Sequence, residues 1–98
     1  MKKLALAAAL AALATPVVAG PIEKACLKSP RPGVTRGLCG CIQQAADRTL
    51  TSTDQRQAAR FFRDPDTAQL VRRSDRQSDE EFWRRYKNFG ATAAAYCG

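Results

Sequence analysis

The four cysteines of this chain, Cys26, Cys39, Cys41 and Cys97, set the strongest limit on how it can fold. The chain has 98 residues, and a domain of this size is only marginally stable when a hydrophobic core alone holds it together. An even number of cysteines in so short an exported chain is typical of a disulfide framework. We therefore expect two disulfides that fasten one small domain.

The first nineteen residues indicate that the chain is exported. A lysine pair precedes an apolar run from residue 4 to residue 14, and small residues follow a Thr-Pro pair, which is the pattern of a secretory signal peptide cleaved after Ala19. The apolar run is shorter than the roughly 20 residues that a membrane-spanning helix needs. We predict a signal peptide over 1–19 and a single helical domain over 20–98. The mature chain is expected to have no transmembrane segment and to reside in the periplasm, or otherwise to be secreted.

The spacing of apolar residues predicts an all-α domain. They recur at intervals of three and four residues, and alternating β-branched residues are scarce. Proline, glycine and capping residues divide the pattern into a small disulfide-stapled bundle of four to five short helices. The expected ranges are 21–28, 36–49, about 53–63, 65–73 and about 79–97.

Capping residues and apolar stripes refine these ranges. Thr35 and Asp64 are expected to cap helices, and capping boxes are expected at Ser52 with Gln55 and at Ser78 with Glu81. The last helix should bury one stripe and leave Trp83 partly exposed. The members of that stripe are Phe82, Tyr86, Phe89, Ala93, and Tyr96 or Cys97. On its outer side, Glu80 with Arg84 and Glu81 with Arg85 have the four-residue spacing of stabilising ion pairs.

Cys39 and Cys41 are separated by one residue in a predicted helix. Residues two apart on a helix point about 200° away from each other, so these cysteines are expected to reach different partners. Two pairings remain: Cys26–Cys39 with Cys41–Cys97, or Cys26–Cys41 with Cys39–Cys97. We prefer the first, because Cys26 and Cys39 lie at similar depths on either side of a Pro-rich turn. Cys41 also shares an apolar face with Leu38, Ile42 and Ala45.

Catalytic chemistry finds little support in the residue types. The chain has no histidine, which removes the usual triads and the C-x-x-C-H haem attachment site. The carboxylates are scattered at expected caps and solvated faces. We predict no catalytic residues, no cofactor and no metal site. The alternative to this non-enzymatic interpretation is a periplasmic thiol-disulfide redox protein that uses Cys39 and Cys41.

Arginine is the remaining signal for function. Eleven arginines and three lysines follow residue 19, and loss of Lys2 and Lys3 with the signal peptide lowers the net charge from +7 to +5. Guanidinium groups suit carboxylates and phosphates. The doublets Arg72-Arg73 and Arg84-Arg85 are the candidate binding surface, with an acidic protein or an anionic envelope component as the partner. Nucleic acid is not expected, because export removes the usual target and no nucleic-acid-binding motif is present.

Four segments together resemble a known family. GPIEKAC, GLCGCIQQAAD, TDQRQAARFFRDP and FWRRYKNFGATAAAYC are similar to a family of small exported alphaproteobacterial proteins that are often labelled "arginine transporter". The resemblance implies the same exported four-cysteine architecture and brings no catalytic or binding residues. A further alternative is therefore an accessory protein or small-ligand carrier associated with amino-acid transport. Transport by this chain alone is not expected, because removal of the signal peptide leaves no membrane-spanning segment.

Overall fold

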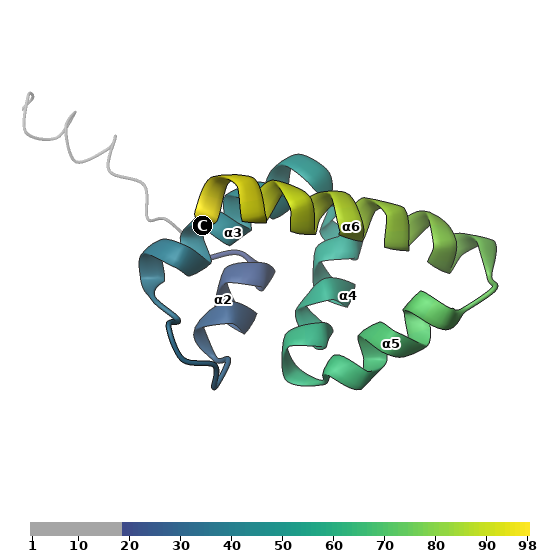
Figure 1. Cartoon of the computed structure of the whole chain (residues 1–98), viewed down its shortest axis with the longest axis horizontal. Helices are drawn as coiled ribbons and strands as arrows, with labels where there is room; N and C mark the ends of the chain where they lie inside the picture. Colours follow the sequence, from purple (N-terminus) through teal and green to yellow (C-terminus); the bar gives the residue numbers. More distant parts are fainter. Residues whose placement is uncertain (1–18) are drawn as a thin grey trace, which may run out of the picture.

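The computed structural model describes residues 19–98 of the chain. The predicted signal peptide lies outside these residues except for Ala19, so its cleavage stays a prediction. Of the described residues, 79% are helical, in five helices and with no strand, as predicted. The helices are α2 (Pro21–Leu27), α3 (Arg36–Thr49), α4 (Ser52–Arg63), α5 (Pro65–Arg73) and α6 (Gln77–Cys97), shown in Figure 1. None of them has the length and apolar character needed to cross a bilayer.

Local sequence signals account for most helix ends. Pro21 occupies the first turn of α2, where a missing amide hydrogen costs nothing. Thr35 caps α3, because its hydroxyl accepts a hydrogen bond from the Leu38 amide at 3.1 Å. The Asp64 carboxylate caps α5 in the same way, and Pro65 follows it at the first helical position. These three starts agree with the sequence analysis.

Both predicted capping boxes are wrong. Helix α4 is capped one residue earlier than expected, by Thr51, whose hydroxyl accepts from the Asp54 amide while the Asp54 carboxylate accepts from the Thr51 amide. Gln55 is absent from this box because its side chain is hydrogen-bonded to residues of α3 and to the α3–α4 connection. Helix α6 begins at Gln77 without any side-chain cap, so Ser78 lies inside the helix.

The helices form a closed circuit around one core. Helix α2 packs against both α3 and α4, α5 packs against α4 and α6, and the long α6 returns to α3. Figure 1 shows α6 along one side of the molecule, with α3 near its C-terminal half and α5 meeting its first turns. The core joins Ile22 of α2 to small residues of α3 and α4 and to aromatic rings of α4 and α6. The first half of α3 and the C-terminal end of α6 thereby lie close enough for a cross-link.

The aromatic part of the core agrees with the predicted α6 stripe. Phe82 and Phe89 are buried, Tyr86 and Trp83 are half-buried, and the Tyr86 ring packs edge-on to Phe61 of α4 with centroids 5.2 Å apart. Edge-to-face contacts of this kind add to the hydrophobic gain from burial. At the C-terminal end of the stripe, Cys97 is half-buried whereas Tyr96 is 73% exposed, so the cysteine is the stripe member there.

The buried face of α3 differs from the expected one. Cys41 is predicted to share a buried face with Leu38, Ile42 and Ala45, yet Cys39 is fully buried and Cys41 only half-buried. Among the residues that α3 buries is Gln43, four residues after Cys39. A polar side chain in the core escapes a search for apolar periodicity, which explains the error.

Candidate functional site

All four cysteines form disulfides. Cys26 of α2 is bonded to Cys39 of α3, and Cys41 of α3 is bonded to Cys97 of α6, with Cα–Cα distances of 5.5 and 5.8 Å. This is the first of the two pairings considered above. Cys39 and Cys41 therefore connect α3 to two different helices, and neither is a thiol here. Intramolecular disulfides indicate a small disulfide-stabilised protein from an oxidising, non-cytoplasmic location.

The two arginine doublets differ in whether their guanidinium groups bind a carboxylate of the protein itself. Arg72 and Arg73 occupy the last turn of α5 and are exposed. Arg84 is exposed on α6, whereas its neighbour Arg85 is bound to Asp54 of α4: Nε to Oδ2 is 2.7 Å and Nη2 to Oδ1 is 3.0 Å. Of the four predicted binding arginines, Arg85 therefore has an internal carboxylate partner.

The Asp54–Arg85 pair ties α4 to α6. The Asp54 side chain is 7% exposed and the Arg85 side chain 43% exposed, so the carboxylate is the buried member. The hydrogen bond from Arg85 lowers the pKa of Asp54, and the Thr51 amide adds to this effect against the opposing cost of burial. In residues 19–98 this is the one ion pair within 4.0 Å, so the predicted Glu80–Arg84 and Glu81–Arg85 pairs do not form. Glu81 instead accepts a hydrogen bond from Gln77.

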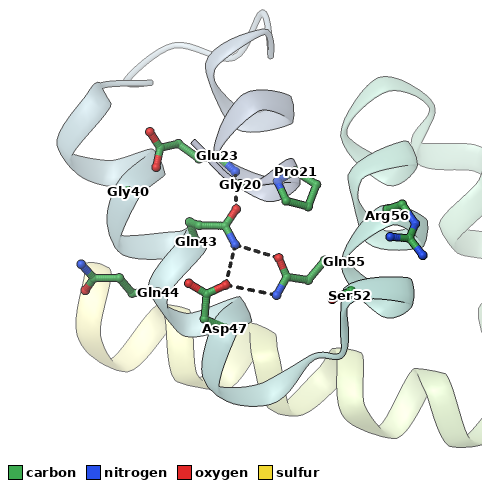
Figure 2. A pocket seen from close by; sticks show the side chains of 10 residues that line it. All are labelled: Gly20, Pro21, Glu23, Gly40, Gln43, Gln44, Asp47, Ser52, Gln55 and Arg56. Carbon is green, nitrogen blue, oxygen red and sulfur yellow. Dashed lines mark hydrogen bonds between the residues drawn. The ribbon is translucent and has the colours of Figure 1, made fainter. Parts of the chain in front are cut away.

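A polar pocket of about 590 Å³ opens between the N-terminal ends of α2 and α4 and the middle of α3. Its floor is a hydrogen-bonded group that we call the amide network: Gln43, Asp47 and Gln55 (Figure 2). Gln43 Nε2 donates to Gln55 Oε1 at 2.7 Å and to Asp47 Oδ1 at 2.8 Å, and Gln55 Nε2 donates to the same Asp47 oxygen at 3.2 Å. Every buried polar side-chain atom in the described residues has a hydrogen-bond partner.

The amide network also fixes the start of α2. Gln43 Oε1 accepts from the backbone amide of Glu23 at 2.9 Å, which supplies a partner to one of the amides that a helix leaves unbonded in its first turn. Gly20 lies directly against the side-chain amide of Gln43, because a Cβ at position 20 would be 2.5 Å from Gln43 Cδ. The network joins α2, α3 and α4 through polar groups that satisfy one another.

A second hollow, of about 340 Å³, lies between α2 and α4 on the side of Lys24. We call it the basic groove, because it is lined by five cations and by no acidic residue. The cations are Lys24, Lys28, Arg56, Arg60 and Arg63. Its other lining residues are Pro21, Ala25 and Ala59. Arg56 and Pro21 also line the polar pocket, so the two hollows are neighbours.

Neither hollow was predicted from the sequence. The basic groove takes Lys24 of α2, Lys28 at the C-cap of that helix and three arginines of α4. Each set follows helical spacing that a search for adjacent doublets passes over. The signal that was available is the recurrence of Arg56, Arg60 and Arg63 at intervals of four and three residues on one helix. Nothing in the sequence indicates that Lys24 and Lys28 face them.

Comparison with known proteins adds no family to this description. The chain matches no protein-family model, no curated protein sequence and no solved structure.

Proposed function

We propose that this chain is a non-enzymatic, disulfide-stabilised binding protein of the periplasm that associates with an anionic partner through its surface cations. The oxidising compartment is supported by the two disulfides, and export by the signal-peptide pattern of the first nineteen residues. A non-enzymatic role is supported by the cysteines, each of which is already bonded to a partner on another helix.

One observation carries the binding proposal: within the described range, thirteen of fourteen arginines and lysines have no acidic side chain within 4.0 Å. All fourteen are classed as exposed, and only Arg85 is held by an internal carboxylate. Cations that are neither paired nor buried keep their Coulomb field available to a partner. An acidic protein or an anionic component of the envelope supplies the complementary charge.

The proposal is tested with defined anionic probes and the disulfide-bonded chain. Polyglutamate, short-chain polyphosphate and vesicles containing anionic lipid are each presented at low ionic strength and at about 0.15 M salt, where charges farther apart than about 8 Å are screened. We expect at least one probe to bind at the higher salt and the affinity to fall as salt increases. Neutral dextran and neutral vesicles are the controls. If none of the anionic probes binds above these controls, the binding proposal is wrong.

Export is tested separately. Amino-terminal sequencing of the protein recovered from the periplasmic fraction is expected to begin at Gly20. A protein that retains residues 1–19, or that is recovered only from the cytoplasm with reduced cysteines, contradicts this part of the proposal.

A further inference from the structure

The five cations of the basic groove lie close together and repel one another, so the fold must offset this repulsion. Lys24 lies in the last turn of α2, and Arg60 and Arg63 lie in the last turn of α4. The two helices begin beside the same polar pocket and pack along each other, so their C-terminal ends lie near the same end of the groove. The partial negative charge of helix C-termini offsets part of the repulsion among these cations. The groove can therefore hold five cations without an internal carboxylate.

The cations are arranged in two facing rows. On an α-helix, residues four apart are separated by about 6 Å along the axis and residues seven apart by about 10.5 Å. Lys24 and Lys28 form one row, and Arg56, Arg60 and Arg63 form the other. The remaining lining residues, Pro21, Ala25 and Ala59, have short side chains, which leaves room for a slender chain.

An extended peptide has the matching repeat. Its alternate side chains point the same way about 6.6 Å apart, and successive side chains point to opposite sides. Consecutive acidic residues in such a segment therefore present carboxylates to both rows at nearly the spacing of the cations. The arginine row adds guanidinium groups that can bind carboxylates through two parallel hydrogen bonds.

We propose that the basic groove binds an extended acidic segment, about three to four residues long, of a partner protein. This inference rests on the proposed anion-binding function and adds its location and the class of partner. Helix α2 and its C-cap residue Lys28 supply one row of cations, and the Cys26–Cys39 disulfide and the amide network hold α2 in place.

The test uses fluorescence anisotropy of a labelled, end-blocked peptide with about four consecutive glutamates and of its glutamine counterpart. The groove variant is Lys24→Gln with Arg60→Gln, and the matched control is Arg72→Gln with Arg73→Gln. Both double variants remove two exposed cations from the last turns of helices. They therefore match in net charge and in the favourable interaction with helix C-termini that is lost. Circular dichroism and a thiol count verify that each variant is folded and disulfide-bonded.

We expect the glutamate peptide to bind, the glutamine peptide not to bind, and the groove variant to lose about tenfold in affinity against about twofold or less for the control. Equal losses in the two variants would overturn the groove as the binding place, while the anion-binding function would stand. Binding of polyphosphate or anionic vesicles without binding of the glutamate peptide would overturn the acidic peptide as the partner. Failure of every anionic probe would overturn both proposals.

Discussion

Replacing Gln43 by leucine tests whether the amide network holds the fold together. Leucine has a similar size and suits a helix, but it removes the hydrogen bonds to Gln55, to Asp47 and from the Glu23 amide. A neutral hydrogen bond contributes about 1 kcal/mol to stability and one to a charged group about 1.5 to 3 kcal/mol. Because Asp47 is exposed and water can replace its lost bond, we expect a net loss of about 3 kcal/mol.

Gln44→Leu is the matched control. Gln44 neighbours Gln43 on the same helix, is exposed, and points away from the network in Figure 2. Urea unfolding with the disulfides intact measures both variants. With a slope near 1 kcal/mol/M for a chain of this size, Gln43→Leu should lower the midpoint by about 3 M and Gln44→Leu by less than about 0.5 M. Equal shifts in the two variants would refute a stabilising role for the network.

One further readout and one further variant separate loss of the network from general destabilisation. Hydrogen exchange at the Glu23 amide should accelerate in Gln43→Leu more than exchange at amides in the middle of α6, because Glu23 loses its partner directly. Gly20→Ala disturbs the same network from the α2 side, since its Cβ would lie 2.5 Å from Gln43 Cδ. We expect it to destabilise the protein by about 1 to 3 kcal/mol, and to add little once Gln43 is replaced by alanine, which has no Cδ for the new methyl group to meet. Additive losses in the double variant would show that the two residues act independently.

Three other predictions concern the links between helices. Arg85→Ala should lower the free energy of unfolding by about 1 to 2 kcal/mol by stranding the Asp54 carboxylate, whereas Arg84→Ala should change it by less than about 0.5 kcal/mol; equal effects in denaturant titrations would contradict the ion pair. The folded-state pKa of Asp54 lies below the ordinary 3.8, so the carboxylate's contribution to the free energy of unfolding is present above about pH 4 and is lost as pH falls through the folded value. In an acid titration, Arg85→Ala should therefore lose less stability than the wild type. Replacing Cys41 and Cys97 by alanine should cost about 4 kcal/mol of stability, and replacing Cys26 and Cys39 about 3 kcal/mol, because the first bond closes a longer loop in the unfolded chain (a separation of 56 residues against 13). The reverse order in thermal unfolding would count against loop closure as the main cause.

Short-range physics explains why the helices were predictable. A proline at the start of α2, a threonine before α3 and an Asp-Pro pair before α5 act on amides within three residues of themselves, so reading them requires no knowledge of the fold. The aromatic stripe of α6 was predictable for a related reason, since its period of three to four residues repeats over a long helix.

The errors have long-range causes. Asp54 caps α4 while it also binds Arg85, 31 residues away, and Gln55 is recruited by Gln43, 12 residues away. These partners outweigh the local capping box predicted at Ser52. On α3, the same network makes Gln43 a core residue, and the face buried by the helix includes Cys39. A buried amide is stable only where partners from other elements meet it, so it leaves no periodic signal of its own.

The sequence by itself therefore determined the all-helical class, most helix boundaries and the need for two cross-links, because propensity, capping and chain length act locally or through composition. Tertiary structure alone decided between the two cysteine pairings, gave Arg85 an internal carboxylate and set the cations of α2 opposite those of α4. Each of these depends on how helices pack against one another. Packing brings together side chains that are distant along the chain, and their spacing in sequence does not reveal which of them will face each other.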